Sequence, residues 1–314
     1  AVAAVGVWIA GARLAGYADA VAERTGLSRA FLGMALLGVA TSLPEVATTI
    51  SGALIGNTRL VSGNLFGGVA LQIAVLAITD LVAVRGALTY FAPRPILLFQ
   101  GTMLMLLVSI ALAGVALGEP VSVRGIGLTP VLLVAGYLFT LRLTQSEAYL
   151  PRWHPADSPE VSDRGHDPPP DDAASDPRLG RGLPWRIAAS GAVILAAGWL
   201  VASTGDALAE QTGLGASFVG VALVAASTSL PELSTTVGAV RRGRHAMAVS
   251  NILGTNCLEV ALFFVADVVY REGPILAVPD ASAMFAGTVA LVVTCIFLLG
   301  LLERRNRTVL GMGV

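Results

Sequence analysis

The stretch Thr41-Ser42-Leu43-Pro44-Glu45 recurs 187 residues later as Thr228-Ser229-Leu230-Pro231-Glu232. Each copy lies inside a long apolar run, so each places a glutamate beside a proline at membrane depth. An ionisable side chain in the hydrocarbon region is costly and by default indicates a functional site. A proline-interrupted helix at corresponding positions of two halves indicates the binding site of a transporter.

The repeat extends well beyond the pentapeptide and contains no gap. At the same offset Thr25-Gly26-Leu27 aligns with Thr212-Gly213-Leu214, and Asn64 aligns with Asn251. Self-similarity at a fixed period indicates that one structural unit has been duplicated. The chain therefore consists of two copies of one unit.

The composition predicts a membrane protein. The chain has 314 residues, of which 55% are hydrophobic and 13% charged, and its mean hydropathy is +0.75. Soluble domains contain about 25% charged residues. Many apolar runs approach the roughly 20 residues that an α-helix needs to cross a bilayer. The net charge of −1 gives no indication of a nucleic-acid partner.

We expect an all-α polytopic membrane protein made of two inverted five-helix repeats, with the broken motif helices packed at the centre. The apolar runs predict spans at 1–17, 28–55, 59–84, 93–116 and 125–145, and then at 184–205, 214–240, 245–270 and 279–303. The repeats cover 1–145 and 184–314. Residues 305–314 align with the start of the fifth span, so we expect ten transmembrane helices, the tenth missing from this chain.

Residues 146–183 separate the repeats and are rich in Pro, Asp and Ser, which predicts a solvated, disordered linker. His154 and His166 lie in it without an HxxxH pair and are interpreted as solvent-exposed residues rather than metal ligands.

Arginine determines the predicted orientation, because the chain contains no lysine. With the N-terminus outside, the inner loops hold most arginines, including Arg241, Arg242 and Arg244. The outer loops hold only Arg59, Arg124 and Arg271. The bias predicts a multi-pass protein of the cell membrane with a cytoplasmic linker. Five spans per repeat is an odd number, so the halves cross the bilayer in opposite directions.

The proline in each motif explains why oxygen groups become available to an ion. Pro44 and Pro231 lack an N–H group and clash with the preceding turn, so each should break its helix. Freed carbonyl groups are tolerated in a bilayer only where they line a cavity or meet an ion. The oxygen groups near the breaks belong to Gly38, Thr41, Ser42 and Glu45 in the first copy and to Ala225, Thr228, Ser229 and Glu232 in the second.

The third and eighth spans add further polar groups. Gln72 and Glu259 are repeat equivalents, and with Glu45 and Glu232 they predict a cage of three carboxylates and one amide. Such an all-oxygen set suits hard cations such as Na⁺ and Ca²⁺. Further possible ligands are Thr255, Asn64, Asn251 and Asn256. Interhelical hydrogen bonding is an equally good interpretation of Asn64 and Asn251, and close helix approach is the simple role of Gly63 and Gly67.

The doubled motif, each copy followed by a Gly/Ser-Asn-x-x-Gly segment, resembles the cation/Ca²⁺ exchanger superfamily, specifically its prokaryotic sodium/calcium exchanger-like members. The resemblance implies ten spans, alternating access and export of Ca²⁺ against Na⁺ or H⁺. It implies that Glu45 and Glu232 bind Ca²⁺. It also implies that the motif Thr and Ser residues bind Na⁺ together with the carbonyl groups of Gly38 and Ala225. No cofactor is expected, and the expected partners are the transported ions and the lipid bilayer. The sequence carries no signal for an oligomeric state.

The chain departs from this family in the third and eighth spans. Gly68 stands where the family usually has Ser, Gln72 where it has Asn or Asp, and Glu259 where it has the shorter Asp. The hydroxyl missing at position 68 removes a potential Na⁺ ligand. A proton-coupled Ca²⁺ antiporter is therefore the alternative to a sodium-coupled one.

Two other classes are less well supported. A cation channel usually draws its acidic groups from symmetry-related subunits around a continuous pore, whereas the internal inverted repeat favours alternating access. An enzyme would need a nucleophile with a base or a metal motif, and the sequence has no HExxH, no GxSxG and no His near the carboxylates. We expect Asp80 and Asp267 to be interfacial, and Asp19 and Glu23 to be solvated.

Overall fold

The structure is a computed structural model that describes residues 2–84, 86–92, 94–145, 179–211, 229–270, 272–278, 280–303, 308–309 and 312–313. Its first half contains α1 (Val2–Thr25), α2 (Arg29–Leu32), the π-helix η1 (Gly33–Leu37), α3 (Gly38–Thr41), α4 (Leu43–Leu54), α5 (Thr58–Ala83), α6 (Leu88–Phe91), α7 (Pro95–Leu117), the strands β1 (Ser122–Val123) and β2 (Ile126–Gly127), and α8 (Leu128–Gln145). Its second half contains α9 (Leu179–Gln211), α11 (Leu230–Arg241), α12 (His245–Val269), the 3-10 helix η3 (Ile275–Ala277), α13 (Ala281–Glu303), and the strands β3 (Thr308–Val309) and β4 (Met312–Gly313).

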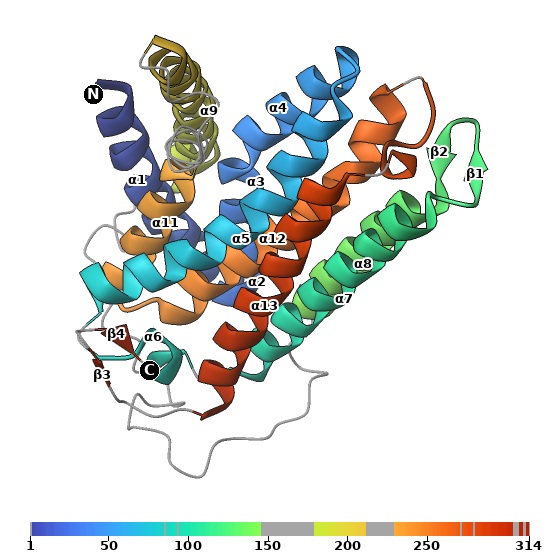
Figure 1. Cartoon of the computed structure of the whole chain (residues 1–314). Helices are drawn as coiled ribbons and strands as arrows, with labels where there is room; N and C mark the ends of the chain where they lie inside the picture. Colours follow the sequence, from blue (N-terminus) through green and yellow to red (C-terminus); the bar gives the residue numbers. More distant parts are fainter. Residues whose placement is uncertain are drawn as a thin grey trace.

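The described helices form the bundle of membrane-crossing length that the sequence predicts (Figure 1). Among the described residues, five helices are long and apolar enough to cross a membrane: α5, α7, α8, α12 and α13. Residues Arg29–Thr41 and Leu43–Leu54 add a sixth candidate, a pair of helices bent by 49°. The prediction of an all-helical membrane protein is therefore confirmed.

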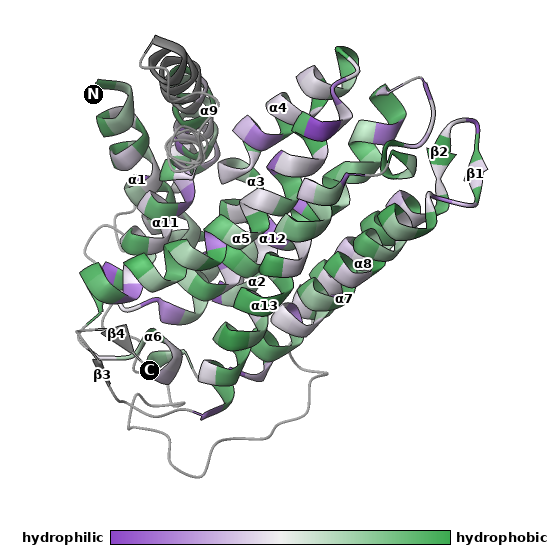
Figure 2. Cartoon of the chain, viewed as in Figure 1, coloured by the Kyte–Doolittle hydropathy of each residue, from purple (hydrophilic) through white to green (hydrophobic). Residues whose placement is uncertain are grey.

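Helix α12 lies at the centre of the bundle, and α13 lies at its periphery. In α12, 72% of the apolar window is buried, and this helix packs against α5, α7, α8, α11 and η1. In α13, which is the most apolar candidate span, only 28% of the window is buried. Figure 2 shows that α7, α8 and α13 are hydrophobic over most of their length. An apolar surface that the protein itself leaves uncovered is the surface expected to face lipid.

The two halves repeat in their loops as well as in their helices. Asp80 Oδ1 accepts the N–H of Leu88 at 2.6 Å, and Asp267 Oδ1 accepts that of Ile275 at 2.7 Å. Both pairs are eight residues apart, so the same cap closes the loop after α5 and the loop after α12. Asp80 and Asp267 thus lie at helix ends, as predicted.

A short hairpin also recurs. Strands β1 and β2 pair antiparallel, with Ser122 opposite Gly127, and β3 and β4 pair in the same way in the second half. The first turn has φ of 56° at Arg124 and 85° at Gly125. These are the left-handed values that a tight two-residue hairpin turn requires.

Two helix ends differ from the prediction for one shared reason. Helix α1 continues to Thr25, beyond the predicted end at 17, and α9 begins at Leu179, ahead of the predicted start at 184. The extension of α1 presents Ala20 and Val21, against which Leu183 of α9 is buried. Contact between two helices distant in sequence therefore stabilises the extra turns. The linker over 146–178, His154 and His166, and the first part of the predicted seventh span lie outside the described residues.

One glycine of α12 allows close helix approach. A Cβ atom at Gly254 would lie 2.6 Å from the Cα of Met34, so α12 and η1 meet backbone to backbone. Among the described residues, no atom lies within 4 Å of a Cβ added to Gly63 or Gly67. The repeat equivalent of Met34 is position 221, which lies outside the described residues, so the packing role expected for Gly63 and Gly67 stays a prediction.

Candidate ion-binding site

The proline motifs begin new helices, as the sequence predicts. Pro44 lies in the first turn of α4 and Pro231 in the first turn of α11. The residues before them, Ser42 and Ser229, have nearly equal backbone angles, with φ of −79° and −85° and ψ of 2° and 5°. Helices α4 and α11 thus begin from the same backbone conformation.

The carbonyl group of Gly38 keeps its helical partner, contrary to the expectation that the break would free it. It accepts the N–H of Ser42 at 3.0 Å and the hydroxyl of Thr41 at 3.3 Å. A proline withholds the hydrogen bond from the carbonyl four residues earlier. For Pro44 that carbonyl belongs to Ala40, which lies two residues after Gly38.

Three buried carboxylates lie near one another. Glu45 is in the first turn of α4, Glu232 is in the first turn of α11, and Glu259 is near the middle of α12; their exposed fractions are 6%, 0% and 0%. The charge of Glu45 acts on both Glu232 and Glu259, and the charge of Glu232 acts on Glu259. The fold therefore brings together the three glutamates that the sequence predicts as one site.

Most oxygen atoms of these carboxylates lack a hydrogen-bond donor among the described residues. They are Oε2 of Glu45, both oxygens of Glu232 and Oε2 of Glu259. Buried polar atoms are almost always paired, and a buried charge needs a counter-charge. Unpaired carboxylate oxygens at helix starts are thus suited to a bound cation or a proton.

Gln72 is the fourth member of the predicted cage, and it contacts the third carboxylate. Its side-chain Nε2 donates a hydrogen bond to Oε1 of Glu259, while its own Oε1 has no partner in the described part of the chain. The amide oxygen of Gln72 therefore remains available as a ligand.

The hydroxyl groups predicted as ligands occupy different surroundings. Thr41 and Ser42 are fully buried, and the Ser42 hydroxyl has no partner among the described residues. Thr255 donates to the carbonyl of Asn251 at 2.8 Å and lies 3.1 Å from a Cβ placed on Gly38. Ser229, three residues before Glu232 in the sequence, is also buried. Ala225 and Thr228 lie outside the described residues.

The asparagines serve helix packing in the second half. Asn251 donates from Nδ2 to Thr235 Oγ1 at 3.0 Å and to Thr236 Oγ1 at 3.1 Å, which connects α12 to α11. Its repeat equivalent, Asn64, is half-buried, and its buried Nδ2 has no partner within the described ranges. Asn256 donates to the carbonyl of Val69 at 3.3 Å and connects α12 to α5.

An ion-pair network that the sequence did not predict joins three helices. Asp19, only 3% exposed, accepts from Nε of Arg29 at 2.7 Å and from Nε of Arg244 at 2.8 Å. Glu23 lies 3.6 Å from both guanidinium groups. The expectation of a solvated side chain is therefore wrong for Asp19, whereas Glu23 is exposed as expected. The partners are up to 225 residues away in sequence, so only the packing of α1 on the core brings them together.

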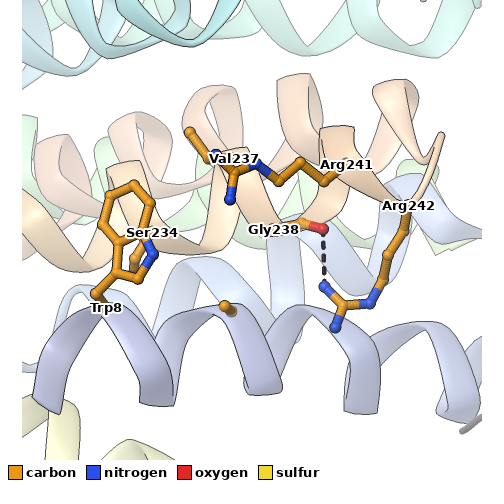
Figure 3. Close-up of a pocket in the computed structure, with 7 residues that line it drawn as sticks. Trp8, Ser234, Val237, Gly238, Arg241 and Arg242 are labelled. Carbon is orange, nitrogen blue, oxygen red and sulfur yellow. Dashed lines mark hydrogen bonds between the residues drawn. The ribbon is translucent and has the colours of Figure 1, made fainter. Parts of the chain in front are cut away.

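A pocket of about 310 Å³ lies between α1 and α11, away from the carboxylates (Figure 3). Trp8, Ser234, Arg241 and Arg242 contribute to its lining, and Arg242 donates to the carbonyl of Gly238 at 2.8 Å. Two guanidinium groups repel a cation, so this pocket is unsuited to Ca²⁺ or Na⁺.

No group of three His, Cys, Asp or Glu residues among the described residues is arranged to hold a metal ion by itself. The ligand set expected here is mixed, with hydroxyl, amide and carbonyl oxygens beside the carboxylates, and part of it belongs to residues 225 and 228 outside those ranges. Hard cations accept such mixed oxygen sets.

Known proteins are similar to this chain over almost its whole length. The profile of the family described as sodium/calcium exchanger protein matches residues 1–143 and 183–312. The putative antiporter CaxA of Alkalimonas amylolytica is 25% identical over 92% of this chain and 86% of that protein. The inner membrane protein YrbG of Escherichia coli K12 is 27% identical over 96% of this chain and 87% of that protein.

Sequence and fold likenesses agree with the family profile. The sodium/calcium exchanger MaX1 of Methanosarcina acetivorans is 33% identical over a shorter region, 29% of this chain and 25% of that protein. A solved structure of the sodium-calcium exchanger NCX_Mj, soaked with Na⁺ and Ca²⁺, superimposes with a TM-score of 0.67. That match covers 95% of this chain and 87% of the other at 17% identity. The chain belongs to the sodium/calcium exchanger protein family and is a membrane transporter rather than an enzyme.

Proposed function

We propose that this protein is a secondary antiporter that exports Ca²⁺ in exchange for Na⁺. In this proposal Ca²⁺ binds between Glu45 and Glu232, with Glu259 and Gln72 completing the cage. The observation that carries the proposal is the convergence of three buried carboxylates whose oxygens mostly lack donors among the described residues. Membership in the exchanger family supports it.

The charge of the site favours a divalent ion. Glu45 and Glu232 lie in first turns of helices, where the backbone dipoles present partial positive charge that assists a carboxylate. Two carboxylates balance one Ca²⁺, and oxygen ligands of this kind suit it. Mg²⁺ is a poorer candidate because it gives up its hydration shell reluctantly.

Obligatory exchange follows from the cost of burying charge. An empty cage would enclose several unpaired carboxylates, which is strongly unfavourable. Only a cage filled by Ca²⁺, or by the counter-ions that replace it, can close. The Na⁺ ligands in this proposal are the hydroxyl groups of Thr41, Ser42, Thr228, Ser229 and Thr255 with the carbonyl groups of Gly38 and Ala225.

The fold suggests which elements move. Helix α1 packs on α11 and on α9, outside the central α12. In the proposed cycle α1 and α9, the first spans of the two halves, slide past the core to expose the cage to either side in turn. In this proposal the N-terminus lies outside the cell and the linker lies in the cytoplasm, and the arginine bias supports this orientation in a cell membrane.

A proton-coupled Ca²⁺ antiporter is the second candidate, and two residues favour it. Gly68 contributes no hydroxyl to the cage, and Glu259 adds a third carboxylate beside Glu45 and Glu232. Carboxylates that share one site bind and release protons as a coupled group, so protons can take the place of Na⁺ in this cage.

The test is Ca²⁺ uptake into proteoliposomes loaded either with Na⁺ or with acid. We expect uptake by the wild type, and its loss in Glu45→Gln and in Glu232→Gln, which keep the shape of the side chain and remove its charge. Glu272→Gln alters an exposed glutamate and is the matched control. Robust transport by both cage variants would refute the site. Uptake driven by a pH gradient alone would replace Na⁺ by H⁺ as the coupling ion.

A further inference from the structure

Gly68 of α5 lies directly against the carboxylate of Glu259 on α12. A Cβ atom at position 68 would lie 2.7 Å from Oε2 of Glu259, 3.1 Å from Oε1 and 3.2 Å from Cδ. Real Cβ atoms essentially never approach another heavy atom within 3.0 Å. Any side chain at position 68 would therefore displace this carboxylate, whereas no atom of the described residues lies within 4 Å of a Cβ placed on Gly67.

The carboxylate of Glu259 is held in its place over Gly68. Gln72, one turn along α5, donates to Oε1 of Glu259. Asn256 donates to the carbonyl of Val69 at 3.3 Å and so keeps the two helices in register. This hydrogen bond occupies Oε1. The other oxygen, Oε2, lies nearest to position 68, is buried and lacks a donor among the described residues.

The internal repeat identifies which groups differ between the two halves. Position 68 corresponds to Thr255, and position 72 corresponds to Glu259. Helix α12 therefore carries a hydroxyl and a carboxylate one turn apart, whereas α5 carries a bare backbone and an amide. Glu259 reaches across the interface and places a carboxylate oxygen beside the backbone where α5 lacks a side-chain oxygen of its own.

We propose that Gly68 is a positioning residue that reserves space for Glu259, so that Oε2 of Glu259 supplies the cation ligand that a hydroxyl at position 68 would otherwise supply. The proposal rests on the function proposed above and concerns the same cage. It makes positions 68 and 259 a coupled pair: an oxygen-bearing side chain at 68 requires an acid shorter by one methylene at 259.

The experiment is a double-mutant cycle in the full-length protein. The variants are Gly68→Ser, Glu259→Asp and the two combined, with Gly67→Ser as the matched control. Two quantities are measured: KM and Vmax for Ca²⁺ uptake into proteoliposomes, and the unfolding temperature of the purified protein in detergent without Ca²⁺. Adjacent residues in direct contact couple strongly, so we expect each single change at the pair to raise KM about tenfold.

The combined variant should recover a KM within about threefold of the wild type, because serine supplies the oxygen and aspartate withdraws from it. Gly67→Ser should leave KM unchanged. If Gly68 had only a structural role, Gly68→Ser would lower the unfolding temperature and Vmax, and the combined variant would not recover the KM of the wild type.

Three outcomes would overturn the proposal. The first is a Gly68→Ser variant that matches Gly67→Ser in both measurements. The second is a combined variant no better than the worse single one. The third is a wild type that takes up no Ca²⁺, which overturns the proposed function and with it the ligand role of Glu259. In that last case the unfolding temperatures still report whether positions 68 and 259 are in contact, which separates the two failures.

Discussion

Replacing Asp19 by asparagine tests the ion-pair network that joins α1 to α2 and to the start of α12. The side chains of Asp19 and Arg244 are 4% and 2% exposed, so water screens their attraction poorly. Removing one partner of a buried ion pair costs 3–5 kcal/mol, because it leaves the other charge uncompensated. Glu23 still lies 3.6 Å from both arginines and offers partial compensation, so we expect about 3 kcal/mol.

The assay is thermal unfolding of the purified protein in detergent. A loss of about 3 kcal/mol corresponds to a decrease of about 5 °C in the unfolding temperature of a chain of 314 residues. Glu23→Gln is the matched control on the same helix. Its side chain is 27% exposed and its contacts are long, so its loss should cost about 1 kcal/mol or less. Equal shifts for Asp19→Asn and Glu23→Gln would refute the reasoning.

Three further predictions follow from contacts outside the cage. Asp267→Ala should lower stability by about 2 kcal/mol, since two backbone N–H groups lose their acceptor, and should leave the KM for Ca²⁺ unchanged in uptake assays. Asn251→Ala should lower the unfolding temperature more than Asn64→Ala does. In the described part of the chain Asn251 donates two hydrogen bonds to another helix, whereas Nδ2 of Asn64 has no acceptor there. A larger decrease for Asn64→Ala would contradict this. Gly254→Ala should reduce the yield of folded protein in size-exclusion chromatography, because its methyl group meets the Met34 backbone, while Gly63→Ala should not.

The predictions from sequence succeeded where the bilayer constrains the chain directly. The bilayer requires long apolar runs, and these predicted α5 and α12 to within a residue or two of their ends. Proline at positions 44 and 231 predicted that new helices, α4 and α11, begin there, since proline lacks the N–H group that a continuous helix needs.

The predictions failed where contacts between distant residues decide the outcome. The end of α1 was predicted too early because Asp19 and Glu23 suggest a solvated loop. Asp19 is in fact buried against Arg29 and Arg244. Charge pairing across 225 residues leaves no periodic signal in the local sequence.

By itself, the sequence determined the membrane class and predicted the duplicated unit, the helix starts at the two prolines and the three glutamates of the candidate site, because each depends on local chemistry or on self-similarity. Tertiary structure alone decided that Gln72 binds Glu259 and that Gly68 makes room for that carboxylate. It also decided that Gly254 brings two helices into backbone contact. These features depend on the distance and rotation between helices, which side-chain packing sets only when the whole bundle has formed.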